Sequence, residues 1–246
     1  MSIEGPDELE GMRAAGRVVA ETIRAMRLEV RPGITTEELD RTAARVFRKA
    51  GARSGPNVDY GFPGVTCISV NDEAVHGIPG PRRLRQGDLV KLDVTAVLDG
   101  FYADACLTVP VGKANGKALS LARTAKQALA EALRVATTGA PINAIGAAAQ
   151  VTTETRGHRV CAELMGHGIG RRIHEPPDVP SAYLPHYDQP LTEGLVMTIE
   201  PIVSAGSGAV VEAGDGWTIR TADGALSAHA EHTIVITRGD PIVLTA

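Results

Sequence analysis

The chain has 246 residues, of which 43% are hydrophobic and 22% are charged, and its formal net charge is −4. This composition is typical of a globular protein with one large hydrophobic core or two smaller ones. It argues against a broadly basic surface for nucleic acid or an anionic membrane, and no apolar run is long enough to predict a membrane-spanning helix.

The cysteines and the N-terminal segment indicate in which cellular compartment the protein is expected. Cys67, Cys106 and Cys161 are odd in number and widely spaced, which favours free thiols in a reducing environment over a disulfide framework. The first residues include acids where a secretory signal peptide needs a basic segment followed by an apolar one. These features predict a cytoplasmic protein.

Two helices are predicted in the first part of the chain. Apolar residues recur at helical spacing over residues 7–28, and an Arg-Pro-Gly break follows at residues 31–33. Thr35 or Thr36 is placed to cap a second helix, which is expected to end after about Lys49.

A second pair of helices follows the same plan. Residues 117–135 predict an Ala/Leu-rich helix, residues 138–141 break it, and another helix is expected from Ile142 to near Arg156. The repeat indicates an α+β fold in which one domain, residues 1–246, consists of two related halves, about 7–112 and 113–246.

Strands are predicted where β-branched residues cluster. The expected strands cover residues 65–70, 195–203, 217–221 and 232–237, whereas residues 71–80 and 206–216 are expected to be mostly loop.

The segment 91–104, KLDVTAVLDGFYAD, predicts a β-hairpin. Asp99-Gly100 is a dipeptide that tolerates the positive φ of a two-residue hairpin turn. Closing the hairpin on this turn places Leu98 opposite Phe101 and thereby sets the register of both strands.

This register brings two carboxylates together. Thr95 lies opposite Asp104, and Asp93 points to the same face as Thr95, so the two aspartates become diagonal neighbours. Such close carboxylates repel each other unless a cation lies between them, which favours a divalent metal. Two solvent-facing acids on a surface hairpin are the alternative.

A glycine-rich loop offers two histidines. His167 lies among three glycines, and His174 follows seven residues later. Glycines allow the backbone to approach a ligand closely, and an imidazole can bind metal or donate a proton. A turn that carries two surface histidines is the alternative.

Two glutamates enter apolar, strand-like segments. Glu200 lies in MTIEPI and Glu231 in AEHTIVI, and lone acids in such surroundings are seldom buried unless they are paired or bound to metal. The alternative for each is an acid at a strand end that faces solvent.

The five candidate ligands form an oxygen-rich set with one imidazole: Asp93, Asp104, His167, Glu200 and Glu231. Such a set suits two ions of Mn, Fe, Co or Zn better than one structural zinc ion. Two metal ions can activate a shared water molecule and polarise a carbonyl group, which predicts hydrolysis of an amide or ester.

Together, the segments KLDVTAVLDGFYAD, GHGIGRRIHEPP, TIEPIV and HAEHTIVIT resemble the methionine aminopeptidases, most closely the bacterial type I form. The segments VNDEAVHGIPG and DGWTIRT are similar to substrate loops of that family. The resemblance covers nearly the whole chain and implies the pita-bread fold, in which two pseudo-symmetric α/β halves surround a curved antiparallel sheet.

The resemblance implies a role for each candidate ligand. Asp93 would bind one of two divalent metal ions, Asp104 and Glu231 would bridge both, and His167 and Glu200 would bind the other. Glu200 would also move the proton of the attacking water to the leaving amine.

The resemblance implies further site residues. His76 would hydrogen-bond to the scissile amide, and His174 would stabilise the oxyanion. Asn71, Glu73 and Ser227 match positions that hold one monovalent cation in relatives.

The methionine pocket implied by the resemblance contains Phe62, Cys67 and Trp217, which are suited to a thioether. Ordinary core packing is the alternative for each of them. Asp59 and Ile173 replace aromatic residues found in many relatives, which predicts a wider or weaker pocket.

The implied activity is removal of the initiator methionine from nascent proteins with a small second residue, by a monomer at or near the ribosome. No specific nucleic acid or membrane is expected as a partner. A proline-specific peptidase of the same fold, which usually has a further N-terminal domain, and a non-catalytic binding homologue are the alternatives.

Overall fold

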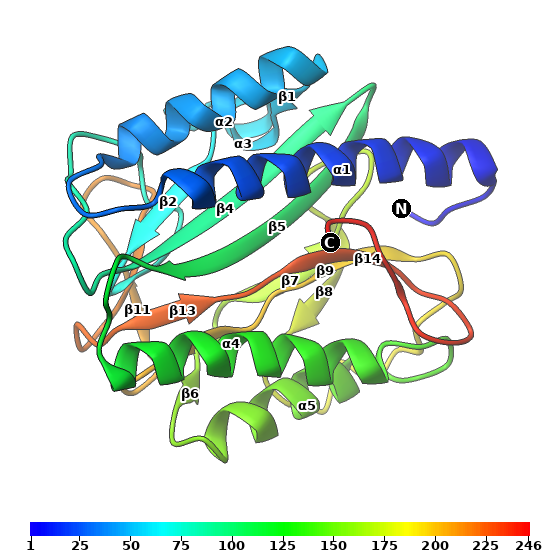
Figure 1. Cartoon of the computed structure of the whole chain (residues 1–246). Helices are drawn as coiled ribbons and strands as arrows, with labels where there is room; N and C mark the ends of the chain where they lie inside the picture. Colours follow the sequence, from blue (N-terminus) through cyan, green and yellow to red (C-terminus); the bar gives the residue numbers. More distant parts are fainter.

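The computed structural model describes residues 1–246 and contains helices and antiparallel sheets (Figure 1). The helices are α1 (Pro6–Glu29), α2 (Thr36–Ala50), α3 (Gly55–Tyr60), α4 (Gly116–Val135) and α5 (Asn143–Glu154). The strands of the first half are β1 (Arg53–Ser54), β2 (Cys67–Val70), β3 (Glu73–Val75), β4 (Leu89–Leu98) and β5 (Phe101–Pro110). The second half contains β6 (Arg159–Val160), β7 (Met165–Gly168), β8 (Glu175–Pro180), β9 (Val196–Ile199), β10 (Ile202–Ser204), β11 (Val210–Glu212), β12 (Ile219–Thr221), β13 (Ser227–His229), β14 (His232–Val235) and β15 (Ile242–Val243). None of the helices combines the length and apolar character needed to cross a membrane.

Local sequence signals set the ends of α2. Of the two expected caps, Thr35 is the N-cap, and it forms a capping box with Glu38 in which each side chain accepts from the backbone N–H of the other. Gly51 ends the helix in the left-handed conformation, with φ of 72°, which glycine adopts without steric cost.

The β4–β5 hairpin has the register expected from its turn. Asp99 and Gly100 have φ values of 49° and 79°, and Thr95 lies opposite Asp104. Alternation along the strands sends the apolar side chains of Leu92 and its same-face neighbours into the core under the helices. Asp93, one residue further, therefore points to the opposite face.

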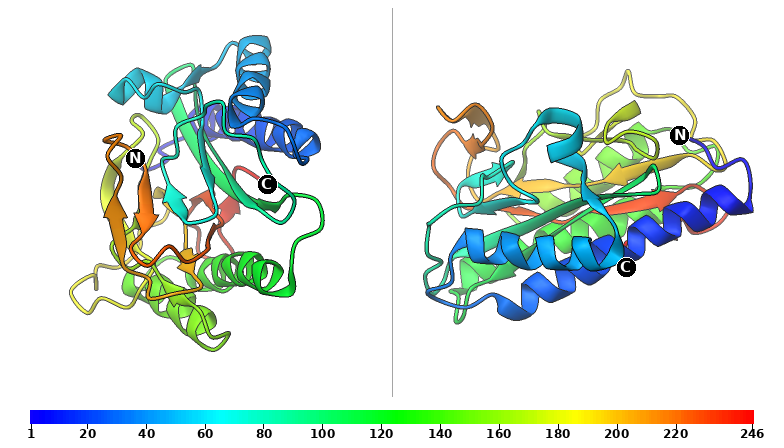
Figure 2. Two further views of the ribbon diagram at one scale, coloured as in Figure 1. Left: turned by 90° about the vertical axis from the view of Figure 1, so that its left-hand side faces the viewer. Right: turned by 90° about the horizontal axis from the view of Figure 1, so that it is seen from above.

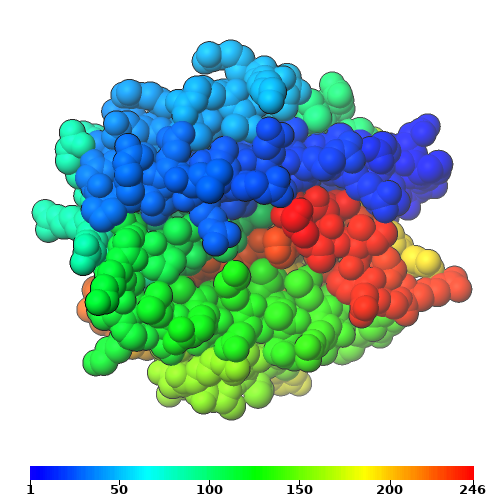
Figure 3. Space-filling model, in the orientation of Figure 1, coloured from blue at the N-terminus to red at the C-terminus, as the bar shows by residue number.

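Two of the long helices lie on one side of the strands. α1 and α4 are on one side, whereas α3 and the β11–β12 hairpin are on the other (Figure 2). On the helical face, α1 and α4 cover the strands, with C-terminal residues exposed between them (Figure 3). Two separate hydrophobic clusters lie beneath these helices, one between α1, α2 and the β4–β5 hairpin and one between α4, α5 and the second-half strands.

The two halves meet along β5 and β14. The Glu231 amide donates to the Cys106 carbonyl at 3.0 Å, and the Asp104 amide donates to the Thr233 hydroxyl at 2.8 Å. β5 belongs to a four-stranded sheet and β14 to a five-stranded sheet, so these bonds hold acids from different sheets side by side.

The structure differs from the expected strands in three places. The expected strand 195–203 is two strands, because the chain leaves β9 at Glu200-Pro201 and enters a different sheet as β10. Proline lacks the N–H needed to continue a sheet ladder. The expected loops 71–80 and 206–216 contain β3 and β11, which pair with β12 on either side.

Candidate metal centre

A cavity of about 210 Å³ is lined in part by Pro56 and Tyr60 of α3, which lies on the opposite side of the strands from α1 and α4 (Figure 2). It is smaller than the ~300–1,000 Å³ of pockets for drug-sized ligands, and its size suits one side chain. Its lining includes all five ligand candidates from the sequence: Asp93, Asp104, His167, Glu200 and Glu231. They come from β4, β5 and β7, from the residue directly after β9 and from the residue directly before β14, so the fold assembles residues that are far apart in the chain.

Three of the five side chains form a compact donor set. Ligand atoms of Asp104, His167 and Glu231 all lie within 4.8 Å of one another. Oδ1 of Asp104 and Oε1 of Glu231 are buried and have no hydrogen-bond partner. Buried polar atoms are normally satisfied, so these two oxygens fit a site that is completed by a bound cation.

The other oxygen of Asp104 is held by the protein. The Thr95 hydroxyl donates to Oδ2 at 2.7 Å across the hairpin. Thr233 fixes the backbone of Asp104 from β14, accepting from its N–H and donating to its carbonyl. One carboxylate oxygen is therefore oriented while the other stays available.

His167 is oriented so that one ring nitrogen is available. Nδ1 lies 2.9 Å from the Gly168 carbonyl, which accepts the Nδ1 proton, so the neutral ring has its lone pair on Nε2. Nε2 lies 3.6 Å from Oε2 of Glu200. The Thr198 hydroxyl connects both residues, accepting from the His167 amide and donating to Oε2 of Glu200.

The four carboxylates among the ligand candidates are expected to be stabilised in their ionised form by a bound cation. Burial raises the pKa of Asp104 to about 6 and the pKa of Glu200 to about 8, and the pKa values of Asp93 and Glu231 rise well above their usual range. Repulsion from neighbouring carboxylates adds to burial for all but Asp104. Burial lowers the pKa of His167 to about 3, so its imidazole is neutral, as metal binding requires.

Two further histidines stand at the cavity. The His174 ring packs edge-on against His167, with ring centres 4.2 Å apart, and its Nδ1 lies 2.6 Å from the Tyr60 hydroxyl. His76 lines the cavity and has a strained backbone, with φ of 56°. Desolvation, aided by His174, lowers the pKa of His76 to about 4, so at neutral pH it can donate one hydrogen bond without carrying charge.

An apolar end of the cavity lies beside this polar group. Phe62 and Trp217 pack edge to face, with ring centres 5.2 Å apart, and Cys67 and Ile173 complete the wall. Phe62, Cys67 and Ile173 are buried, so Phe62 and Cys67 line the cavity and also have the core packing that was the alternative for them.

Asp59 does not belong to the cavity lining. Its carboxylate accepts from the Tyr102 hydroxyl at 2.8 Å and from the Ile173 amide at 3.3 Å. The pocket wall that Asp59 was expected to alter is provided instead by its neighbour Tyr60 and by Ile173.

Sequence reasoning missed His229, which also lines the cavity. Both of its ring nitrogens are buried without a partner, and Nε2 lies 3.5 Å from Oε2 of Glu231. The alternation of side chains along a strand could have predicted this, because His229 lies two residues before Glu231 and residues two apart in an extended segment share a face. Thr95 was placed opposite Asp104 from the sequence, but its hydroxyl contact was not foreseen.

Comparison with known proteins gives consistent results. The sequence pattern of metallopeptidase family M24 matches residues 10–238. Methionine aminopeptidase 2 of Bacillus subtilis is 41% identical, with 100% of this chain and 99% of the relative covered. Methionine aminopeptidase of Clostridium perfringens is 40% identical, with coverage of 99% and 98%.

Solved structures agree with the sequence matches. Methionine aminopeptidase from Thermotoga maritima superposes with a TM-score of 0.96 at 36% identity and covers 100% of this chain and 99% of its own. Prolidase from Pyrococcus furiosus has a TM-score of 0.79 at 22% identity, with 99% of this chain and 65% of prolidase covered, which shows a shared fold alone. These similarities confirm the pita-bread fold.

Proposed function

Because the chain belongs to metallopeptidase family M24, we propose that it is a metal-dependent aminopeptidase that removes the initiator methionine from proteins. The observation that carries this proposal is the donor set of Asp104, His167 and Glu231, whose ligand atoms converge in a cavity that aromatic and aliphatic side chains also line. The names of the full-length relatives support methionine as the residue released.

Five side chains would hold two divalent ions: Asp93, Asp104, His167, Glu200 and Glu231. The unpaired oxygens of Asp104 and Glu231 would be available to these ions. Ions held there would lower the pKa of a shared water molecule and polarise the scissile carbonyl group. The donor set suits Mn, Fe, Co or Zn and does not choose among them.

The remaining chemistry belongs to the side chains around the donor set. Glu200 accepts a proton from the attacking water and delivers it to the leaving amine. His76 donates a hydrogen bond to the scissile amide, and His174 stabilises the negative charge that develops on the carbonyl oxygen. The contact between Tyr60 and His174 holds that imidazole at the cavity.

The apolar end of the cavity receives the methionine side chain. Phe62 and Trp217 provide aromatic faces, and Cys67 adds a polarisable sulfur next to the thioether. The preference for a small second residue rests on the family resemblance.

The proposed cellular role is the maturation of newly synthesised proteins, as in bacteria. The substrates are N-terminal segments of nascent chains near the ribosome, and the enzyme works as a monomer within one catalytic domain. Three free, buried cysteines support a reducing compartment such as the cytoplasm.

The test is substrate choice. Metal-loaded protein is incubated with Met-Ala-Ser, Met-Lys-Ser and Ala-Pro-Ala, and the released amino acids are quantified by chromatography. Methionine release from Met-Ala-Ser well above that from Met-Lys-Ser supports the proposal. Cleavage confined to the bond before proline would identify a proline-specific peptidase, and no cleavage of any peptide would favour a non-catalytic homologue.

A further inference from the structure

Lys91 is a buried cation that the proposed reaction does not use. It lies on β4, two residues before Asp93, and therefore projects from the same face of the strand. Only 1% of its surface is exposed. Lysine is rarely buried without a partner, so its surroundings need an explanation.

The ammonium group is bound entirely by neutral oxygens. Nζ donates to the Asn71 carbonyl at 2.8 Å, to the Ser227 hydroxyl at 3.1 Å and to the Ser227 carbonyl at 3.3 Å. Three acceptors match the three protons of the charged form, whereas a neutral amine has only two.

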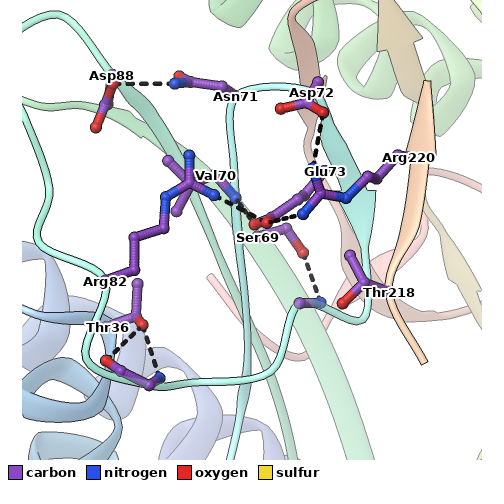
Figure 4. Close-up of polar contacts among 12 residues, drawn as sticks. Thr36, Ser69, Val70, Asn71, Asp72, Glu73, Arg82, Asp88, Thr218 and Arg220 are labelled. Carbon is purple, nitrogen blue, oxygen red and sulfur yellow. Dashed lines mark hydrogen bonds and ion pairs between the residues drawn. The ribbon is translucent and has the colours of Figure 1, made fainter. Parts of the chain in front are cut away.

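The acids nearby are engaged elsewhere. Glu73 pairs with Arg82 at 2.8 Å and with Arg220 at 2.9 Å, and Asp72 pairs with Arg220 at 3.2 Å (Figure 4). Lys91 therefore does not complete a salt bridge. Carbonyl and hydroxyl oxygens around a single positive charge are instead the surroundings that suit a monovalent cation.

The acceptors belong to the two segments that lead into the site. Asn71, with φ of 61°, starts the turn into β3, and His76 directly follows that strand. Ser227 starts β13, and Glu231 follows its end by two residues. The Ser227 hydroxyl also donates to the Asn71 carbonyl at 2.9 Å, so the ammonium group lies where both segments meet β4.

We propose that the Lys91 ammonium group is a built-in monovalent cation that positions the His76 loop and the Glu231 segment relative to Asp93. This inference rests on the proposed function. Asn71 and Ser227 are two of the residues for which the family resemblance implied a monovalent cation, and the ammonium group lies among their oxygens. Lys91 is a positioning residue, and turnover by this chain needs no free Na⁺ or K⁺.

The first test uses the unaltered, metal-loaded protein. Na⁺ and K⁺ are replaced by choline at constant ionic strength, and kcat, KM and Tm are measured. All three stay unchanged if Lys91 supplies the cation. A requirement for Na⁺ or K⁺ would overturn the proposal, and this arm needs no variant to fold.

The second test removes the Lys91 ammonium group by substitution. Lys91→Ala is expected to lower kcat/KM about tenfold or more, as loss of an outer partner of a metal site does, and to lower Tm by about 5 °C. K⁺ restores both values in a saturable way. Propylammonium, which replaces the missing part of the side chain, does the same, whereas choline and 1-propanol do not.

Two matched variants separate charge from packing and from net charge. Lys91→Met fills the space without charge and should lose activity that K⁺ cannot restore. Lys117→Ala removes an exposed lysine from α4 and should behave like the unaltered protein under every salt.

Several outcomes would contradict the inference. One is that neither K⁺ nor propylammonium changes the kcat/KM or the Tm of the Lys91→Ala variant. Another is equal restoration by 1-propanol, which would assign Lys91 to packing. The Tm measurements do not depend on peptide cleavage, so they test the cation even if the protein proves to have a different substrate.

Discussion

The Thr95 hydroxyl donates to Oδ2 of Asp104 at 2.7 Å, while Oδ1 of the same carboxylate is buried without a partner. The pair lies directly across the β4–β5 hairpin. One oxygen is thus held in place by the protein, and the other is left to be satisfied by a bound cation.

This relationship predicts the effect of removing one hydroxyl. Thr95→Val keeps the shape of the side chain but releases Oδ2 of Asp104, and is expected to weaken metal binding about 10- to 100-fold. Thr95→Ser, which keeps the hydroxyl, should bind metal nearly as well as the unaltered protein. Calorimetric titration of metal-free protein measures both affinities, and equal affinities for the two variants would show that the hydrogen bond does not orient the ligand.

Asp104→Asn tests the bridging assignment directly. The amide nearly preserves shape but removes the charge, so metal-dependent turnover is expected to fall by more than about 100-fold. The fold should persist, because the change also removes one of the mutually repelling buried carboxylates from the metal-free protein. Peptide cleavage and thermal unfolding of the metal-free form check these two expectations, and substantial turnover in this variant would contradict the two-metal site.

Glu200 predicts how metal-free stability depends on pH. Its pKa is raised to about 8 from an ordinary value of 4.5, so the folded state binds this proton more tightly than the unfolded state. The resulting stabilisation is complete below the ordinary pKa and is lost as pH rises through the raised pKa. Between about pH 6.5 and pH 8, it should fall by about 2 kcal/mol.

Chemical denaturation at both pH values tests this, with Glu200→Gln as the control that lacks the titrating group. The difference in pH dependence between the two proteins isolates Glu200. Bound metal should abolish this difference, because it requires the ionised carboxylate at both pH values. Identical pH dependence of the two metal-free proteins would be inconsistent with a raised pKa at Glu200.

Trp217 tests the methionine pocket. Trp217→Ala removes one aromatic wall, and the lost apolar contact is expected to raise KM for Met-Ala-Ser about tenfold with a smaller change in kcat. Tyr183→Ala, which removes an aromatic side chain that is 53% exposed, is the matched control. An unchanged KM in the Trp217 variant would place the methionine side chain elsewhere.

Local signals in the sequence predicted the hairpin and its carboxylates. Asp99-Gly100 determined the turn, the turn determined the register, and the register placed Asp93 and Asp104 on one face. The capping residues of α2 were likewise readable, because a cap depends on residues only a few positions apart.

Long-range packing explains what the sequence did not reveal. β3 was expected to be loop because its pairing partner, β12, lies in the other half of the chain. Asp59 was assigned to the pocket by family resemblance, whereas its contacts with Tyr102 and Ile173 depend on the folded arrangement. Lys91 resembles an outward-facing strand residue until Ser227 packs over it.

Metal-dependent release of methionine tests the central claim most directly. The protein is stripped with a chelator, dialysed, and incubated with Met-Ala-Ser before and after stepwise addition of Mn²⁺ or Co²⁺. Methionine release should be absent from the stripped protein and should return as the added metal is bound. Undiminished release by fully stripped protein, or no release with any metal in correctly folded protein, would contradict the account.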